Sequence, residues 1–458
     1  MNTTLRTASL AALVGLGMLA EARPAAACAV FTPPVAPIVT DHRMIVSVGR
    51  DESTLYDEVR YQGSPESFAW VLPISGEAKV GLSAEVLFSA LDARTRVTVR
   101  APDPKCPPPP PSSASCQGRA GAFGTPGAAN DGVTVTKREV VGPYETVQLQ
   151  SSDPKALTDW LGKNGFVVPD DVKPLVATYV AEKLNFLAMK LVPGQNVKAM
   201  RPIRVTTKGS NVTVPLRSIS AGTGPSVKLA LWVVGQGRYE PVNFPTFTIP
   251  SSDLVWDWTA NASNREALRS EKLGISKGRG WELHSSVDLS LEGLREEVSQ
   301  PRRYEPNDPN APSDYAAIEA KEGAPAKSIA EVRDEDLKVL GGSSGGGVRV
   351  TFLQAELPRE SLGSDMILAA SADQSPLPAE RTVAKEIGEP QCPVYGECGE
   401  IERYVPRSEA EAAGGSSQAA TSGCSTTNGG TSGSGAGSFA AVLGVALAVV
   451  RARGRRAR

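Results

Sequence analysis

The chain has 458 residues and nearly balanced charge, with 48 Lys and Arg against 50 Asp and Glu. A nucleic-acid-binding protein requires a clustered basic face, which this composition argues against, so we predict no nucleic-acid partner. Aromatic residues make up 5% of the chain and only two histidines occur, at positions 42 and 284, which narrows the plausible catalytic chemistry.

The N-terminus is typical of a secretory signal peptide, predicted over residues 1–27. Arg6 supplies a positive charge, residues 10–19 form a short apolar core, and three alanines ending at Ala27 precede Cys28. This order predicts export across the inner membrane and cleavage between Ala27 and Cys28. The apolar core is too short to span a bilayer. Lipidation of Cys28 is the alternative, although lipoprotein signals usually carry Leu three residues upstream, where this chain has Ala.

Residues 28–200 are predicted to form a mixed α/β domain. Short alternating or continuously apolar stretches favour strands, and apolar residues that repeat every three to four positions favour helices. A Pro/Gly-rich insertion near residues 103–132 predicts disorder. In chain order we expect strands at 44–48, 58–62 and 68–74 (a central strand stopped by Pro73), a helix at 82–93 capped by Ser83, a strand from Val97, strands at 133–136 and 144–149, helices capped by Asp153 and by Asp170 or Asp171, and a strand at 185–192.

Two further units are predicted downstream. Short apolar runs separated by turn residues favour an antiparallel β unit over residues 201–260. Residues 261–400 predict a mainly helical unit in short pieces with a final strand at 348–352, and nothing folded is expected beyond about residue 400. Because helices and strands do not alternate strictly, the fold class is predicted as α+β, with strand-rich mixed units and short helices.

The C-terminal part combines a linker, an apolar segment and a basic end. Residues 401–437 predict a Gly/Ser-rich linker, and from residue 414 they are almost entirely Gly, Ser, Thr and Ala, which cannot bury a core. Residues 438–458 hold a short apolar run and an Arg-rich terminus, which predict a membrane segment, at least a transient one, with the Arg residues in the cytoplasm. Cys424 precedes these elements, and the order resembles the MYXO-CTERM sorting tail of myxobacterial surface proteins. The resemblance implies that Cys424 is a processing or attachment residue.

Four other cysteines form two pairs that are close in sequence. In an exported protein such pairs favour disulfides. Cys106 and Cys116 flank a proline run, and Cys392 and Cys398 form the second pair. Six cysteines allow many connectivities, so pairing within each close pair is a hypothesis. The cysteine spacing and the scarcity of His argue against zinc, and no metal or cofactor is predicted.

Several ordered motifs occur in the central region. They include FAWVLP at 68–73, VGPYE at 141–145, DWL at 159–161 and FLAMKL at 186–191. Together, over about residues 28–375, they resemble the DUF2330 family, a domain of unknown function. The resemblance implies an exported protein of this family. The family has no established activity, so it implies no catalytic residue.

The catalytic patterns in the sequence are weak. Residues 341–346 contain Gly-x-Ser-x-Gly, but a nucleophile elbow needs a strand before its Ser and a helix after it. Here a helix-like segment precedes and a strand follows, which favours a connector. His42 and His284 could act as acid–base residues, but no accompanying nucleophile is evident.

Two other clusters have an ordinary explanation beside a functional one. Asn307, Asp308, Asn310 and Asp314 gather oxygen ligands for calcium, but they lack the Gly and terminal Glu of a known calcium loop, so a solvated loop is favoured. Trp256 and Trp258 flank Asp257 and could stack on a sugar, although packing is the commoner role of such residues.

These observations predict an exported cell-envelope or surface protein. A non-enzymatic binding or structural role is favoured, with the membrane and the export and sorting machinery as expected partners. The alternative is an exported hydrolase whose active site involves His42 or His284. The ligand is not predicted.

Overall fold

The computed structural model describes residues 38–62, 69–108, 140–166, 168, 170, 172–192, 200–210, 212–221, 223–299, 329–342, 347–396 and 400–418. The chain divides into two compact units. The larger unit contains Met1–Pro104 and Gln117–Pro390, and the smaller unit contains Lys105–Cys116 and Gln391–Arg458. The described residues form several sheets and short helices, which confirms the predicted α+β class.

An eight-stranded sheet organises the larger unit. Its strand order is β13-β16-β17-β11-β1-β2-β9-β4. β1 pairs with β11 in parallel and β13 with β16 in parallel, and the other neighbours are antiparallel. The strands are β1 (Ile38–Val48), β2 (Glu52–Gln62), β4 (Ala78–Leu82), β9 (Ile203–Lys208), β11 (Thr223–Gly235), β13 (Thr246–Phe247), β16 (Trp281–Ser290) and β17 (Gly347–Pro358).

One face of this sheet is covered by three helices, α1 (Glu85–Thr95), α6 (Leu291–Ser299) and α8 (Ile329–Gly341). Their apolar side chains pack around Trp232 of β11 and Phe352 of β17. The two rings are stacked with centroids 4.7 Å apart, and Phe88 of α1 meets Trp232 edge-on at 6.3 Å. This aromatic cluster is therefore the centre of the core on the helical side.

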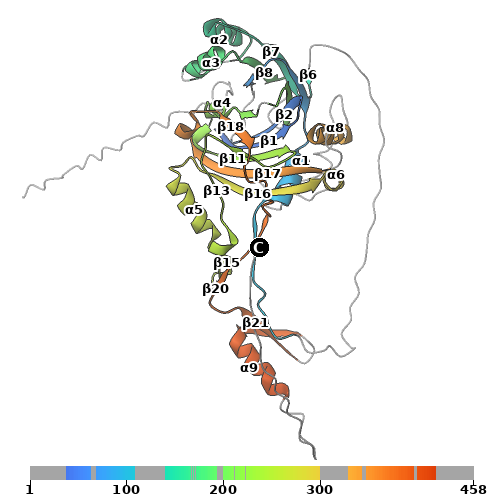
Figure 1. Ribbon diagram of the computed structural model, residues 1–458, viewed down its shortest axis with the longest axis vertical. Helices are drawn as coiled ribbons and strands as arrows, with labels where there is room; N and C mark the ends of the chain where they lie inside the picture. Colours follow the sequence, from blue (N-terminus) through green and yellow to red (C-terminus); the bar gives the residue numbers. More distant parts are fainter. Residues whose placement is uncertain are drawn as a thin grey trace, which may run out of the picture. The chain divides into compact units, whose positions relative to one another are not determined.

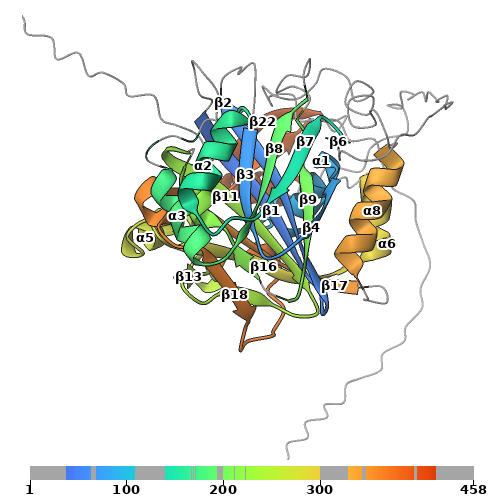
Figure 2. The same cartoon turned by 90° about the horizontal axis from the view of Figure 1, so that it is seen from above.

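The other face packs against a four-stranded sheet of order β3-β8-β7-β6. Leu231 and Val233 of β11 point into this second core. The small sheet carries α2 and α3 on its outer side, as Figure 1 and Figure 2 show. The elements are β3 (Ala69–Ile74), β6 (Val140–Val141), β7 (Tyr144–Leu149), β8 (Asn185–Leu191), α2 (Pro154–Lys163) and α3 (Lys173–Ala181).

Shorter elements complete the larger unit. Three small sheets have the orders β10-β18-β12, β15-β14-β20 and β19-β5. Their strands and the remaining helices are β5 (Thr98–Arg100), β10 (Thr213–Val214), α4 (Leu216–Ser220), β12 (Tyr239–Pro241), η2 (Ser251–Asp253), β14 (Val255–Asp257), β15 (Ala262–Ser263), α5 (Arg265–Ile275), η3 (Arg359–Leu362), β18 (Met366–Ala370), β19 (Glu380–Thr382) and β20 (Lys385–Ile387).

A buried carboxyl group, Asp336 of α8, ties the helices to the sheet. It accepts hydrogen bonds from Ser83 Oγ at 2.8 Å, from the Ala84 amide at 2.8 Å and from Arg204 Nη1 at 2.6 Å. Burial raises the pKa of Asp336 to about 7, although Arg204 and the hydrogen bonds act in the opposite direction. The prediction that Ser83 caps α1 is therefore wrong. The residue before the helix is Ala84, and the carboxyl of Asp336 satisfies its amide.

Some predicted elements are confirmed and others are corrected. Asp153 caps α2, with its carboxylate accepting from the Lys155 amide at 2.8 Å, as predicted. The predicted cap of α3 by Asp170 or Asp171 is not found at Asp170, because Val172 precedes the helix and the Asp170 carboxylate pairs with Lys173 Nζ. Asp171 lies outside the described residues. β3 is an edge strand rather than a central one, and Pro73, which has no N–H to donate, is tolerated there.

The division into units also differs from the prediction. Strands from 28–200, 201–260 and 261–400 pair in one sheet, so residues 200 and 260 do not separate compact units. β16 lies in the range predicted as mainly helical. Its buried polar residues Glu282 and His284 break the apolar alternation that a strand prediction relies on.

The smaller unit contains folded residues beyond 400, contrary to the prediction. The strands β21 (Gln391–Tyr395) and β22 (Ile401–Pro406) form a hairpin, followed by α9 (Arg407–Gln418). Within the described part of the chain, no helix is long and apolar enough to cross a membrane. Residues 438–458, predicted as a membrane segment, lie outside the described residues, as do the signal peptide and the candidate processing residues Ala27, Cys28 and Cys424.

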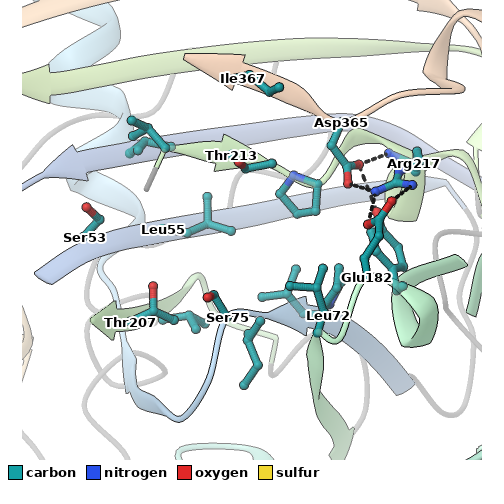
Figure 3. A pocket seen from close by; sticks show the side chains of 18 of the residues that line it. Ser53, Leu55, Leu72, Ser75, Glu182, Thr207, Thr213, Arg217, Asp365 and Ile367 are labelled. Carbon is teal, nitrogen blue, oxygen red and sulfur yellow. Dashed lines mark hydrogen bonds and ion pairs between the residues drawn. The ribbon is translucent and has the colours of Figure 1, made fainter. Parts of the chain in front are cut away.

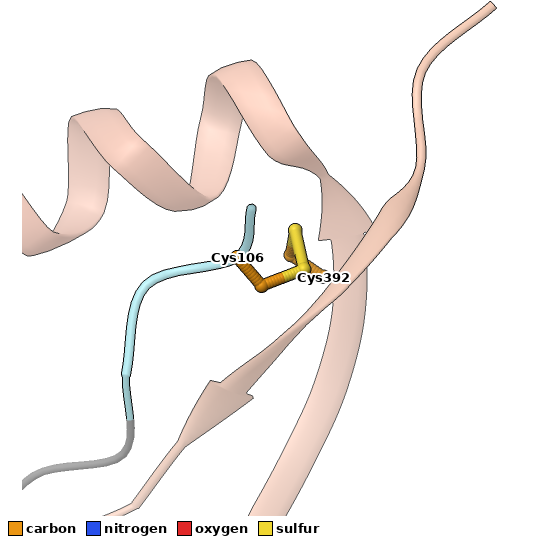
Figure 4. The surroundings of a disulfide bond; sticks show 2 residues. All are labelled: Cys106 and Cys392. Carbon is orange, nitrogen blue, oxygen red and sulfur yellow. A yellow bond between two sulfur atoms is a disulfide. The ribbon is translucent and has the colours of Figure 1, made fainter. Parts of the chain in front are cut away.

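A disulfide joins Cys106 to Cys392 across 286 residues of sequence, with the Cα atoms 5.3 Å apart (Figure 4). The predicted pairing of Cys106 with Cys116, and of Cys392 with Cys398, is therefore wrong for the two described cysteines. The reason is that the fold brings residues 105–108 beside β21, so spatial proximity overrides proximity in sequence. Cys116 and Cys398 lie outside the described residues.

Peptide mapping without reduction is expected to return one cross-linked species that contains Cys106 and Cys392. Replacing both by Ser should destabilise the smaller unit by about 2–4 kcal/mol, because the bridge restricts the unfolded chain and the described core holds few other side chains. Limited proteolysis near residues 400–418 measures this loss. The same digest after reduction is the control, and a Cys106–Cys116 species would contradict the assignment.

Candidate functional site

A cavity of about 490 Å³ lies between the eight-stranded sheet and the four-stranded sheet of the larger unit (Figure 3). Its floor is formed by Val46, Leu55 and Val205, which project from β1, β2 and β9. Leu72 of β3 and Leu184, which follows α3, form the opposite wall. The volume falls in the range of roughly 300–1,000 Å³ that is typical of small-molecule sites.

Arg217 stands at one end of this cavity and makes ion pairs with two carboxylates (Figure 3). Its Nη1 and Nη2 donate to Glu182 Oε1 and Oε2 at 2.8 and 2.6 Å. Nη2 also donates to Asp365 Oδ2 at 2.6 Å, and the Arg217 amide donates to Asp365 Oδ1 at 2.9 Å. We call Glu182, Arg217 and Asp365 the charged triad.

Three separate elements position the triad. Arg217 is in the first turn of α4, Glu182 directly follows α3, and Asp365 lies between η3 and β18. Tyr179 of α3 reinforces the arrangement, since its hydroxyl donates to Asp365 Oδ1 at 2.9 Å and its ring lies 4.4 Å from the Arg217 guanidinium carbon. A guanidinium over an aromatic face is an attractive cation–π contact.

The triad also changes the acidity of its members. The hydrogen bond from Arg217 lowers the pKa of Glu182, which keeps this carboxylate ionised at neutral pH. The hydrogen bond to Glu182 raises the pKa of Arg217. Burial raises the pKa of Tyr179 far above its ordinary value, so its hydroxyl stays a neutral hydrogen-bond donor. Two acidic side chains therefore face one cation at this end of the cavity.

The opposite end carries hydroxyl groups. Figure 3 shows Ser53 and Thr207 farthest from the triad, with Leu55, Ser75 and Thr213 in the middle and Leu72 beside Glu182. Ser53 Oγ already donates to the Gly209 carbonyl oxygen at 2.9 Å. The cavity thus has one charged end, one hydroxyl end and a largely apolar middle that also holds Ser75 and Thr213, and it could hold a ligand with an apolar body and a polar group.

His42 does not line this cavity. It is buried on β1, and its Nδ1 lies 3.1 Å from Asp57 Oδ1 of β2. The pair joins neighbouring strands within the sheet, which is the role of a structural ion pair or hydrogen bond. The hydrolase hypothesis that involves this residue stays untested.

His284 is buried in a different cluster. The Val97 amide donates to its Nδ1 at 3.3 Å, so in the neutral ring the proton is on Nε2, which lies 3.3 Å from Glu282 Oε2. Glu282 also accepts from Arg265 and from Arg269 of α5, the latter at 3.0 Å. The cluster fastens α5 to β16.

The acidities in this cluster follow from burial and charge. Burial lowers the pKa of His284, against the opposing pull of Glu282, so the ring is neutral at pH 7. Burial alone would raise the pKa of Glu282, but His284, Arg265 and Arg269 outweigh it and lower this pKa to about 2.

The tryptophan motif forms a turn in which Trp258 and Asp257 have hydrogen-bond partners, whereas the buried indole N–H of Trp256 has none in the described part of the chain. Trp256 is buried and meets the ring of Trp258 edge-on at 6.1 Å. The Trp258 indole N–H donates to Glu386 Oε2 at 2.8 Å, and Asp257 accepts from the amide of Thr259 at 2.8 Å. Packing and a local turn account for this motif.

The remaining candidates lie wholly or partly outside the described residues. Of residues 341–346, only Gly341 and Gly342 are described; they end α8, and β17 follows, so the order is helix then strand, as predicted. Asn307, Asp308, Asn310 and Asp314 lie outside the described residues. Among those that the structure describes, no group of three or more His, Cys, Asp or Glu side chains is placed to hold a metal ion.

Sequence reasoning missed the charged triad entirely. Arg217 is 35 residues from Glu182 and 148 residues from Asp365, so no local spacing links them. No local pattern in the sequence points to these three residues as partners.

The fold and the cavity define an α+β protein with a ligand-sized space between two packed sheets. Residues 22–278 match the model of the DUF2330 family, described as an uncharacterized protein conserved in bacteria. The match covers more than half of the chain, so the chain belongs to this family, as its motifs predict.

Curated proteins and solved structures do not indicate a function for this chain. No curated protein matches the chain. Among solved structures it is similar to the crystal structure of baculovirus P35, at 12% identity and a TM-score of 0.26, over 44% of this chain and 66% of that one. A likeness this low carries no functional conclusion.

The His284 cluster predicts a loss of stability in acid. The unfolded chain protonates His near its ordinary pKa while folded His284 resists, so stability falls as pH drops below about 6.5. Glu282 contributes stability above its ordinary pKa of 4.5 and loses it as pH falls through about 2. Glu282→Gln should lower the free energy of unfolding at pH 7 by about 3 kcal/mol, because it leaves arginines without their carboxylate.

Urea unfolding of the wild-type chain and of Glu282→Gln between pH 7 and pH 3 gives the free energy of unfolding, and so measures both the loss of stability in acid and the effect of the substitution. The matched control is Glu266→Gln on α5, whose exposed side chain pairs with Arg269 at 3.4 Å and should contribute less than about 1 kcal/mol. Equal stability of the two variants would contradict the structural role of Glu282.

Proposed function

We propose that this chain is an exported cell-envelope protein that binds a small ligand in the cavity between its two sheets. The observation that carries the proposal is the cavity itself, which joins a largely apolar middle to a charged end whose geometry is already fixed by hydrogen bonds. Preorganised polar groups in an apolar space are characteristic of binding sites, because little ordering is left to occur on association.

A binding role is favoured over catalysis by the chemistry of the described lining. It includes neither His nor Cys, and its carboxylates already accept hydrogen bonds from Arg217 and Tyr179. A nucleophile next to a base would be needed for covalent hydrolysis. The lining instead offers shape, apolar surface and charge.

The location is proposed from the two ends of the sequence. The signal-peptide layout of residues 1–27 supports export, with cleavage before Cys28. The linker, Cys424, the short apolar run and the terminal Arg cluster support sorting to the cell surface by a MYXO-CTERM-like tail. On this proposal the membrane is a partner during sorting, and the folded part is displayed outside the inner membrane.

Filling the cavity tests the binding role. The mature protein is expected to raise the fluorescence of N-phenyl-1-naphthylamine, which is bright in apolar sites. Leu55→Trp places a larger side chain in the middle of the cavity and should weaken probe binding by about tenfold or more, which is about 1.4 kcal/mol. Titration of the probe at fixed protein concentration gives the affinity.

The control is Ile387→Trp, which adds the same side chain at an exposed position of β20 outside the cavity lining. It should leave probe binding unchanged, and near-ultraviolet circular dichroism verifies that both variants are folded. The proposed function fails if the wild-type chain does not bind the probe, or if a folded Leu55→Trp variant binds it as tightly as wild type.

Intact-mass spectrometry of the protein isolated from its native envelope tests the location. We expect a mass that begins at Cys28 and ends near Cys424, because both terminal signals are removed. Any excess mass would identify the modification on either cysteine. A mass that still includes residues 438–458 would mean a lasting membrane segment and would contradict cleavage of the tail.

A further inference from the structure

Resting on the proposed function, we propose that the ligand carries a positively charged amine on an apolar body, with the amine held by Glu182 and Asp365. The charge balance of the cavity carries this inference. Two carboxylates face one guanidinium, so the charged triad has one surplus negative charge. The described lining contains no other Lys, Arg or His to balance it.

Arg217 is badly placed to receive an anionic ligand. Both of its terminal nitrogens donate to carboxylates, and its Nε, which has no hydrogen-bond partner in the described part of the chain, is buried away from solvent. A ligand carboxylate at this end would therefore meet two like charges before it met a free donor. Like charges at close range are repulsive, and the repulsion is stronger in a partly dry cavity than in bulk water.

The carboxylates, in contrast, can accept more hydrogen bonds. A carboxylate offers about four lone-pair sites. Arg217 occupies one on each oxygen of Glu182, and a single donor reaches Oδ2 of Asp365. The Glu182 side chain is 42% exposed, so it remains accessible to an incoming group. An ammonium has three donors and no acceptor, which complements this arrangement.

The cavity and the surface beside it offer apolar side chains to the body of the ligand. Leu55 and Leu72 line the cavity, and Ile367 of β18 extends the lining. Val242 lies next to Ile367, since its amide donates to the Ile367 carbonyl oxygen at 2.9 Å, and both side chains are largely exposed. These side chains favour a ligand with an elongated apolar body over a compact polar one. The reason is that binding is stabilised when the ligand covers exposed apolar surface.

Competition among three probes of equal chain length tests the inference. Decylamine, decanol and decanoate, each below its micelle concentration at pH 7 and low salt, compete with N-phenyl-1-naphthylamine for the full mature chain. Decylamine should displace the probe at about tenfold lower concentration than decanol, and decanoate should be weaker still. Added salt should reduce the preference for decylamine.

Glu182→Gln removes the surplus charge and should bring decylamine to within about threefold of decanol. Glu182 follows the end of α3 and is partly exposed, so the variant should fold. The matched control is Glu266→Gln, which removes one carboxylate of the same unit outside the cavity lining and should keep the wild-type preference.

The outcomes separate the two proposals. No binding of N-phenyl-1-naphthylamine overturns the proposed function. Probe binding with equal displacement by the three competitors, or with decanoate strongest, overturns the amine inference and leaves the binding role intact. A preference for decylamine that survives in Glu182→Gln also overturns the inference, because the amine would then bind elsewhere.

Discussion

The parallel pairing of β1 with β11 is the constraint on which the larger unit depends. It joins residues 38–48 to residues 223–235, and loops of this length cost conformational entropy to close. Burial of the centre of β11 on both faces offsets this entropy loss. Leu231 and Val233 face the four-stranded sheet, and Trp232 and Val234 face the helices. Burial contributes roughly 25 cal/mol per Å² of apolar surface. Both layers, and the cavity floor at Val46 of β1, are thereby set by one strand pair.

The charged triad forms one end of the cavity, away from the floor that the large sheet provides. Arg217 links the end of α3 to α4 and to the turn before β18, three elements that the sheet alone does not join. The pair with Asp365 is largely buried and the pair with Glu182 is partly exposed, and neither kind of ion pair is strong evidence for stability. On the proposed binding role, the placement of three charged groups at the end of a ligand-sized cavity serves the ligand as well as the fold.

The sequence predicts what is local and misses what depends on distant neighbours. The capped helix α2 and the strand β8 follow from Asp153 and from a continuous apolar run, and both are confirmed. β16 was missed because Glu282 and His284 are polar yet buried. Glu282 is paired with Arg269 of α5, and His284 accepts a hydrogen bond from the Val97 amide next to β5, and no sequence pattern reveals these partners. The Cys106–Cys392 bridge and the charged triad depend on contacts across 286 and 148 residues, so sequence spacing could not identify them.

The family motifs and the cavity occupy overlapping but different parts of the chain. Leu72, Pro73 and Tyr179 lie in the region that matches the DUF2330 model, and they line the cavity. Asp365 and Ile367 lie beyond residue 278, outside the matched region, yet they complete the charged end and extend the apolar surface. The matched region thus includes the part of the enclosing wall that β3 and α3 contribute. On the proposed amine preference, the surplus negative charge needs Asp365, which lies outside the matched region, so this preference is proposed for the cavity of this chain and not for the family.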